Sequence, residues 1–226
     1  MRYLFTNRFG GISTGVYDNL NLALHVGDNP LNVKSNRDIL AEKIGTKNLV
    51  FMDQVHQDNI KIITNNNQTT TMACDGMITN LKSVALCAMV ADCIPVLFYD
   101  SFKKVIAVVH AGRNGVYLKI ANKIIEKMIT DFSCSAKNIK VFVGPSIKSC
   151  CYEVKNDVTK GFENYLHVDN GKTYLDIVQK CIDDIQSIGI KKENIDVSTT
   201  CTSCDKDFFS YRRDGVTGRF CGVIRL

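Results

Sequence analysis

Short apolar runs rich in valine and isoleucine recur along the chain, and turn-forming residues separate them. Runs of this kind are typical of buried strands. The predicted strands cover residues 3–7, 59–64, 84–90, 94–99, 104–110, 139–143, 195–199 and 222–226.

Other stretches place apolar residues at helical spacing, and the first of them carries clear boundary signals. Asn29 and Pro30 are typical of an N-cap and a first helical turn, and Gly45 is typical of a helix end. The predicted helices cover residues 31–44, 116–132, 153–166 and 174–188. Because strands occur in runs and also alternate with helices, the pattern predicts an α+β fold of layered mixed β-sheets flanked by helices.

The chain shows no internal repeat and no change of composition that would mark a domain boundary. The polar stretch NNNQTTT at residues 65–71 suits a loop tip and is too short for an interdomain linker. Hydrophobic residues make up 45% of the sequence and charged residues 23%, so the chain can bury an ordinary globular core. We therefore expect a single domain over residues 1–226.

Charge and apolar-run length limit the expected partners and compartment. The net charge is +5, but lysine and arginine are scattered, so we expect neither nucleic acid nor a membrane as partner. The mild positive charge suits a small anionic substrate, and no obligate protein partner is indicated. The first residues lack the apolar core of a signal peptide, and the longest apolar runs are too short to cross a bilayer. We therefore expect a cytoplasmic protein.

The ten cysteines are predicted to be reduced thiols, because a chain without a secretion signal is expected in a reducing compartment. Cys87, Cys134 and Cys181 lie among apolar residues and are predicted to be small core side chains. The adjacent Cys150 and Cys151 are likewise predicted to be structural.

A predicted hairpin brings together two residue types that bind metals. Residues 100–103 join the strands predicted over residues 94–99 and 104–110, and such a short connection favours an antiparallel hairpin. If Asp100 pairs with Lys103, Cys93 lies directly opposite His110, and cross-strand partners have Cβ atoms about 5 Å apart. Zinc bonds cysteine sulfur at about 2.3 Å and histidine nitrogen at about 2.0 Å, so one ion can bridge such a pair. A three-residue turn would shift the pairing by one and point the side chains of Cys93 and His110 to opposite faces.

A third ligand must come from another segment. Besides His110, the chain has three histidines. His56 ends an apolar stretch, His25 lies in a loop-like stretch, and His167 follows a predicted helix. Residue chemistry alone leaves both His56 and His25 open as the third ligand.

Several blocks between residues 6 and 220 resemble one known family, and they occur in that family's order. The blocks are TNRFGGISTGVYDNLNLALHVGDNP, NR at residues 36–37, QVH, ADCIPVLFYD, HAGRNG, VGPSIKSCCYEV and CTSCDKDFFSYRRDGVTGRF. The chain thus resembles the laccase-domain proteins, also called polyphenol oxidase-like, which are linked to purine nucleoside phosphorylase activity. The resemblance covers nearly the whole chain.

The resemblance implies a metal centre and an activity. The family's zinc ligands are the histidine of QVH, the cysteine of ADC and the histidine of HAG, which correspond here to His56, Cys93 and His110. Three protein ligands leave an open position, which is typical of catalytic zinc. The resemblance implies zinc-dependent phosphorolysis of purine nucleosides (adenosine, inosine or methylthioadenosine) with phosphate, and hydrolytic deamination of adenosine.

Further site residues are predicted around this centre. Arg37, from the NR pair, is the candidate for holding phosphate, and Asp75 is the candidate general acid or base. Asn21 and Arg212 lie in matching blocks and are additional catalytic candidates. Asp92, beside the metal cysteine, is predicted to orient a ligand.

The chain departs from the family pattern close to the predicted centre. The family commonly has HAGWRG where this chain has HAGRNG, and Gln57 stands where glycine usually follows QVH. The ligands are retained, so the departures concern the substrate wall and the position of Arg113. The turn with Gly112 and Gly115 is a second candidate for binding an anion through backbone N–H groups.

A copper-dependent, laccase-like polyphenol oxidoreductase is the alternative function. Two histidines and a cysteine are also the core of a blue-copper site, with Met52 or Met89 available as an axial ligand. Four histidines are too few for the copper clusters of a multicopper laccase. A single copper ion could still occupy the site in vitro.

A zinc site like that of cytidine deaminases is not supported. Its signature needs H-x-E and P-C-x-x-C. Here His56 is followed by QD, and Thr200 precedes the first cysteine of the CxxC pair. Cys201 and Cys204 are therefore predicted to be a pair of loop thiols.

Overall fold

The computed structural model describes residues 1–71, 73–155 and 159–226, which form three β-sheets and the helices that cover them. The first sheet has five strands in the order β1 (Arg2–Phe5), β14 (Phe220–Arg225), β6 (Val84–Val90), β2 (Asn48–Met52) and β4 (Thr70–Thr71). The second has six, in the order β13 (Ile195–Val197), β9 (Ile139–Val143), β7 (Ile94–Asp100), β8 (Val105–Ala111), β5 (Gly76–Thr79) and β3 (Ile60–Ile62). The third has three, in the order β10 (Glu153–Val154), β12 (Lys172–Leu175) and β11 (Leu166–Asp169).

The two large sheets pack face to face, because their strands are apolar on both sides. β6 and β8 are buried throughout, which is the pattern of strands covered on both faces. Leu86 and Ile224 from the first sheet share one apolar cluster with Leu97 and Val108 from the second. This cluster is the centre of the molecule.

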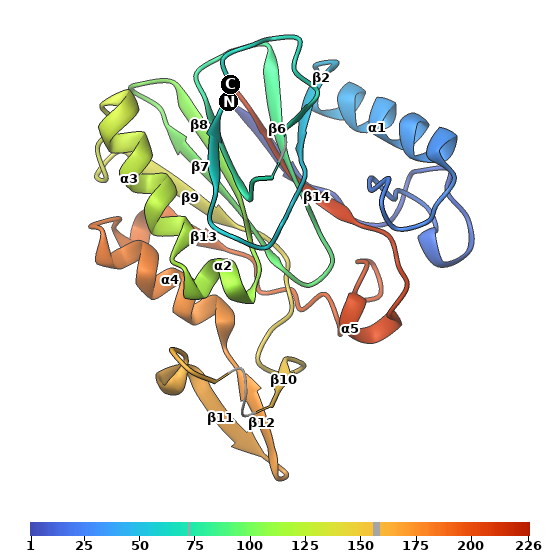
Figure 1. The fold of residues 1–226 in the computed structure, drawn as a ribbon, viewed down its shortest axis with the longest axis vertical. Helices are drawn as coiled ribbons and strands as arrows, with labels where there is room; N and C mark the ends of the chain where they lie inside the picture. The colour runs from blue at the N-terminus through green and yellow to red at the C-terminus, as the bar shows by residue number, and fades with distance from the viewer. Residues whose placement is uncertain (72, 156–158) are drawn as a thin grey trace.

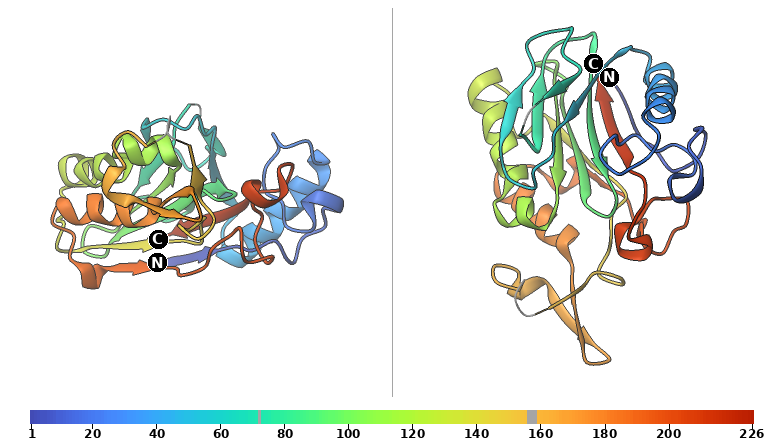
Figure 2. Two further views of the ribbon diagram at one scale, coloured as in Figure 1. Left: turned by 90° about the horizontal axis from the view of Figure 1, so that it is seen from below. Right: turned by 45° about the vertical axis from the view of Figure 1, so that its right-hand side comes forward.

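Helices cover the outer faces of both sheets, which gives four layers (Figure 1, Figure 2). α1 (Pro30–Ile44) packs on the first sheet, where Leu40 meets Phe51. α3 (Ile120–Phe132) and α4 (Ile177–Ser187) pack on the second, where Ile124 and Ile185 join the cluster around Val141. The α+β class predicted from the sequence is confirmed, with layered mixed sheets flanked by helices.

Two short helices complete the described elements, together with single 3₁₀ turns. α2 (Arg113–Tyr117) follows β8, and α5 (Tyr211–Asp214) precedes β14. The 3₁₀ turns are Gly15–Tyr17, Glu163–Tyr165 and Lys192–Asn194. Every helix among the described residues is too short or too polar to traverse a lipid bilayer.

Local signals predicted the first helix well and the second only in part. The side chain of Asn29 accepts the N–H of Leu31, and Gly45 ends α1 in the left-handed region. The helix predicted over residues 116–132 is split, because Lys119 has a φ of 57° and separates α2 from α3. The split lets α2 stay at the end of β8 while α3 lies along the sheet.

The helix predicted over residues 153–166 is wrong where the segment is described; residues 156–158 lie outside the described residues. β10 begins this segment, Gly161 has a left-handed φ of 83°, and Leu166 opens β11. Val154 and Phe162 are both buried in the core around α3 and α4. Each of these two residues contacts the core separately from an irregular segment. Their spacing in the sequence happens to match that of a helix, although the described residues between them form none.

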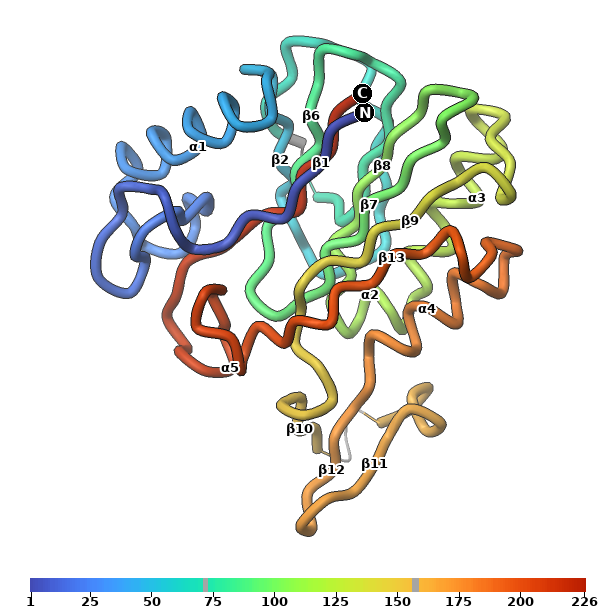
Figure 3. The backbone as a smooth tube through the Cα atoms, turned by 180° about the vertical axis from the view of Figure 1, so that it is seen from behind, coloured from blue at the N-terminus to red at the C-terminus, as the bar shows by residue number. Residues whose placement is uncertain are grey.

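The small sheet of β10, β12 and β11 projects from the body of the molecule (Figure 1, Figure 3). β12 occupies the beginning of the helix predicted over residues 174–188, and α4 starts only after Asp176, whose side chain accepts the N–H of Gln179. The carboxylate cap thus sets the boundary between strand and helix.

The central cluster predicts a simple stability test. Leu97→Ala removes a side chain that is 0% exposed between the two sheets, so the free energy of unfolding should fall by about 2–5 kcal/mol. Leu31→Ala, at a position 73% exposed on α1, should change it by about 0.5 kcal/mol or less. Urea denaturation of both variants measures the difference, and equal small effects would contradict the packing described here.

Candidate metal centre

Three side chains from three chain segments converge at one end of the sheet sandwich. His56 lies in the loop after β2, Cys93 lies just before β7, and His110 lies near the end of β8. One ligand atom from each residue lies within 4.8 Å of the other two. The rings of His56 and His110 meet edge to face, with centroids 4.7 Å apart. The structure thus brings together the three residues predicted as metal ligands.

The pairing predicted for the hairpin is wrong by two residues, yet the convergence remains. Pro95 is the partner of His110, and Asp100 pairs with Val105, so the connecting loop is longer than expected. A shift of two residues keeps every side chain on its original face, because side chains alternate along a strand. Cys93 therefore lies diagonally from His110, on the same side of the hairpin.

A buried carboxylate organises two of the three ligands. Asp75 is 0% exposed, and its Oδ1 atom lies 2.7 Å from Nδ1 of His110. The same carboxylate accepts the backbone N–H groups of Val55, His56 and Gln57, at 3.2, 3.1 and 2.9 Å. Because Asp75 holds Nδ1 of His110, the Nε2 atom is the nitrogen left for an ion.

The electrostatics of the cluster favour a thiolate. Burial raises the pKa of Cys93, but His110 and His56 more than offset it and lower that pKa to about 6. Burial lowers the pKa of His110, but the Cys93 thiolate and Asp75 more than offset it and raise that pKa to about 9. A cation that replaces the His110 proton would find a charged sulfur already formed, which is the form that binds metals.

The three-residue cluster opens into a cavity of about 290 Å³, the metal cavity. Its walls are His25, Gln54, His56, Met89, Val90, Ala91, Cys93, His110, Tyr211 and Arg219. A neighbouring cavity of about 220 Å³ shares Ala91, Cys93 and Tyr211 with it. The second cavity also has Arg113, Tyr152 and Arg212 in its wall. The cluster of His56, Cys93 and His110 thus lies where the metal cavity meets this second cavity, which is named the aromatic cavity for Tyr152 and Tyr211 in its wall.

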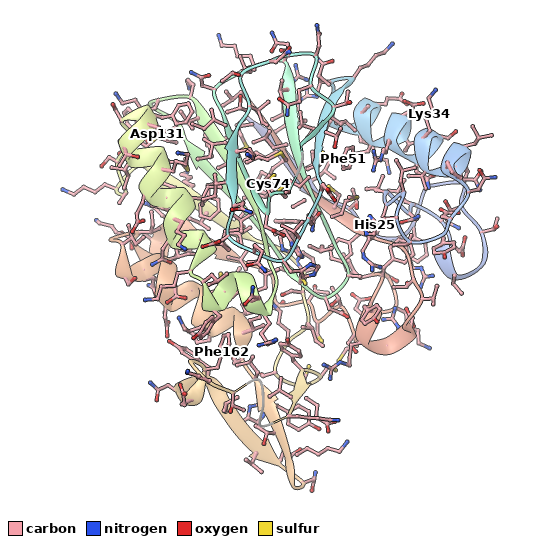
Figure 4. All side chains as sticks on the ribbon, in the orientation of Figure 1. His25, Lys34, Phe51, Cys74, Asp131 and Phe162 are labelled. Carbon is pink, nitrogen blue, oxygen red and sulfur yellow. The ribbon has the colours of Figure 1, made fainter. Side chains whose placement is uncertain are left out.

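Arg37 lies in a third cavity of about 680 Å³, which shares His25 and Met89 with the metal cavity. Its Nε donates to the carbonyl of Leu22 at 3.0 Å, and its guanidinium stacks 3.8 Å from the Phe51 ring centroid. Burial lowers the pKa of Arg37. The structure therefore places this predicted phosphate ligand beside the metal cavity and not on its wall. Figure 4 shows Phe51 and His25 on the same side of the molecule.

Asn21 and Asp75, both predicted as catalytic, are buried and do not line the metal cavity. The side-chain carbonyl of Asn21 accepts the backbone N–H of Arg219 at 2.9 Å, and its amide donates to Asp28 at 2.9 Å. Asn21 therefore joins the loop before α1 to the loop before β14. Asp75 acts on the cavity through the ring of His110 and the backbone of His56.

Arg212 and Asp92 shape the aromatic cavity. The carboxylate of Asp92 accepts the backbone N–H of Arg212 at 2.7 Å and the hydroxyl of Thr202 at 2.7 Å. The guanidinium of Arg212 donates to the carbonyl of Glu153 at 2.9 Å and lies 5.3 Å from the Tyr152 ring centroid. Asp92 thus holds the wall that carries Arg212 next to Cys93.

Three side chains that line the metal cavity, those of Gln54, Tyr211 and Arg219, were not predicted from the sequence as site residues. Tyr211 and Arg219 lie within the family-like block CTSCDKDFFSYRRDGVTGRF, but nothing in the pattern singled them out. Gln54 belongs to the QVH motif; its side chain donates to the carbonyl of Met89 at 2.8 Å and accepts the N–H of Met89. His25, the other candidate ligand, lies on the wall and outside the three-residue cluster.

Comparisons with known proteins identify the family of the chain. Residues 2–226 match the family described as multi-copper polyphenol oxidoreductase laccase. A purine nucleoside phosphorylase of Corynebacterium glutamicum is 37% identical, with 100% of this chain and 94% of that protein covered. The purine nucleoside phosphorylase YlmD of Bacillus subtilis is 30% identical, with 98% and 87% covered.

Solved structures show the same fold. The YfiH protein of Bacillus licheniformis superposes with a TM-score of 0.94 at 33% identity, covering 99% of this chain and 92% of that one. YlmD of Geobacillus stearothermophilus gives a TM-score of 0.93 at 31% identity, covering 99% and 90%. With its fold and its sequence in agreement, the chain belongs to the multi-copper polyphenol oxidoreductase laccase family, and its relatives include proteins named purine nucleoside phosphorylases.

Proposed function

We propose that this protein is a zinc-dependent purine nucleoside phosphorylase that also deaminates adenosine. The expected nucleosides are adenosine, inosine and methylthioadenosine, with inorganic phosphate as second substrate. The observation that carries the proposal is the cluster of His56, Cys93 and His110 at the junction of two cavities. The names of the relatives support the phosphorylase activity.

The donor set fits zinc. Two imidazole nitrogens and one thiolate are ligands that zinc accepts, and three protein ligands with an open side are typical of catalytic sites. When bound, zinc would act as a Lewis acid towards an oxygen atom of a substrate. Asp75 acts on this centre as a positioning residue, because it fixes the ring of His110 and the backbone of His56.

The two cavities suit the two substrates. Tyr152, Tyr211 and Ile177 offer aromatic and apolar surface to a purine base in the smaller cavity. Arg219 offers a guanidinium to phosphate in the metal cavity, and a guanidinium pairs well with phosphate oxygens. Because Tyr211 and Cys93 border both cavities, the glycosidic bond would lie near the metal centre.

Phosphorolysis balances with these parts. An oxygen of hydrogen phosphate forms a bond to the anomeric carbon of ribose while the bond from that carbon to the base nitrogen breaks. The proton of the hydrogen phosphate passes to the base nitrogen, so the products are ribose-1-phosphate and free base. The transition state is expected to resemble an oxocarbenium ion. Arg219 would hold the attacking anion, and the aromatic wall would hold the leaving base.

Activity is tested with the zinc-loaded protein under anaerobic conditions. Inosine should yield hypoxanthine only when phosphate is added, and adenosine should yield both adenine and inosine. Chromatography of the products distinguishes the two reactions. Absence of base release under these conditions would contradict the phosphorylase proposal.

The second candidate is a copper-dependent polyphenol oxidoreductase, which the family description and one geometric feature favour. Met89 lines the metal cavity and carries a thioether, the group that a blue-copper site uses as an axial ligand; in this structure its sulfur lies 4.0 Å from Nη2 of Arg37. Rapid, oxygen-consuming turnover of phenols by a copper-loaded form, without base release by the zinc form, would favour this candidate.

Asp75→Asn should weaken zinc binding about 10–100-fold, as is usual when the hydrogen-bond partner of a ligand is altered. The amide cannot hold the His110 ring in the same way as the carboxylate. Competition with a chromophoric chelator measures the zinc dissociation constant. Asp58→Asn is the matched control, because Asp58 lies in the loop that carries His56 and pairs with Lys123 instead. Equal affinities in the two variants would remove the role assigned to Asp75.

Arg219→Ala should raise the KM for phosphate about tenfold or more, since a hydrogen bond to a charged group contributes about 1.5–3 kcal/mol. Adenosine deamination, which uses no phosphate, should change much less. Arg37→Ala is the comparison, because the sequence predicted Arg37 as the phosphate ligand and the structure places it in the next cavity. A larger effect on phosphate KM from Arg37→Ala would reverse this assignment.

A further inference from the structure

A second cluster of metal-binding side chains lies apart from the three-residue centre. It consists of thiols from two segments about fifty residues apart, and nothing in the sequence indicates that they are in contact. The members of this four-cysteine cluster are Cys150, Cys151, Cys201 and Cys204. Their sulfur atoms all lie within 4.8 Å of one another.

The spacing of these sulfur atoms matches a tetrahedral metal site. Zinc–sulfur bonds of about 2.3 Å place the corners of a tetrahedron about 3.8 Å apart. The Sγ atoms of Cys150 and Cys151 are 3.8 Å apart, those of Cys150 and Cys204 are 3.7 Å apart, and those of Cys151 and Cys204 are 3.3 Å apart. A disulfide needs about 2.0 Å. The separations are therefore nearer to those of metal-bound thiolates than to that of a covalent bond.

The backbone around Cys201 prepares its sulfur for a cation. The backbone N–H groups of Lys148, Cys204 and Ser203 are hydrogen-bond donors to the sulfur of Cys201. Hydrogen bonds from the backbone to the first sulfur of a CxxC turn stabilise the thiolate form, which is the form that binds metals. The positive charge of Lys148 interacts with Cys201 and Cys150, which offsets part of the negative charge of a thiolate cluster.

The turn that carries two of the cysteines is held by independent contacts. The guanidinium of Arg213 donates to the carbonyls of Thr202, Asp205 and Phe208, at 2.9, 3.1 and 2.8 Å. A bridge joins Cys201 to Ser146 on the other segment, where the N–H of Thr202 donates to the Ser146 carbonyl at 3.1 Å. The fold thus positions the turn that carries Cys201 and Cys204 against the segment that carries Ser146.

We propose that the four-cysteine cluster binds one zinc ion as a closed, structural site. Four thiolates fill a tetrahedral coordination sphere and leave no position for a substrate, which is typical of structural zinc. Soft sulfur ligands select zinc or another thiophilic ion over magnesium or calcium. The chain would then hold two zinc ions of different kinds, where the sequence predicted a single metal centre.

The position of the cluster indicates what the ion would do. Cys151 directly precedes Tyr152, and the loop containing Cys204 leads to Tyr211 and Arg212. These three aromatic and basic side chains line the cavity beside the metal centre. The ion would join the two segments that form this wall. Its effect on nucleoside binding rests on the proposed function, whereas metal binding by the cluster does not.

Metal content of the intact protein, purified under a reducing agent, tests the proposal by elemental analysis. We expect about two zinc ions per chain in the wild type, and one fewer in Cys204→Ser. Ser203→Ala, on the same turn, is the matched control and should keep the wild-type content. Cys93→Ser should lose a different ion, so the double substitution should lose both.

The wild-type protein provides a second measurement that does not depend on folding of a variant. In the zinc-loaded protein, Cys150 and Cys204 should resist iodoacetamide although both are exposed, and a strong chelator should make them react. Mass spectrometry of the peptides reports each site. Rapid alkylation before chelation, a disulfide within the cluster under reducing conditions, or unchanged zinc content in Cys204→Ser would each overturn the proposal. None of these readouts involves nucleoside turnover, so failure of the proposed function would leave them interpretable.

Discussion

The buried carboxylate of Asp75 is the group on which the metal centre depends. It precedes β5 in the second sheet, contacts the ring of His110 on β8, and binds the backbone of the loop that follows β2 in the first sheet. A charge buried this deeply persists only because several donors surround it, and removing one partner of such a network is costly. The same contacts join the ends of both sheets and set the distance between His56 and His110.

Loops from both ends of the chain complete the cavities around the three-residue cluster. Asn21 fixes the backbone of Arg219, and Asp92 fixes that of Arg212, so buried polar side chains hold the two guanidinium groups at the cavity walls. The four-cysteine cluster belongs to the two segments that also carry Tyr152 and Arg212 of the aromatic cavity. Rigid side-chain contacts, and not long secondary-structure elements, therefore determine the shape of the cavities, as expected where function lies on loops carried by a stable scaffold.

Strands and helix ends were predictable because their signals are local. A strand buried on both faces, such as β6, is an unbroken apolar run, and a capping Asn29 with Gly45 marks both ends of α1. The segment over residues 153–166 was not predictable in this way, since Val154 and Phe162 contact the core separately. Hairpin register was also beyond a local pattern, because the loop between Asp100 and Val105 admits more than one length.

By itself, the sequence determined the fold class and the placement of most strands, because alternation and capping are properties of single segments. Its short motifs, through the family resemblance, also pointed to His56, Cys93 and His110 as candidate metal ligands. Tertiary structure alone decided which residues meet. It placed Asp75 against His110, put Arg37 in the neighbouring cavity, put Arg219 on the wall of the cavity that contains the three-residue cluster, and gathered four cysteines that the sequence keeps in two separate pairs. The physical reason is that a buried contact depends on three-dimensional packing, and residues far apart in the chain carry no local sign of being neighbours.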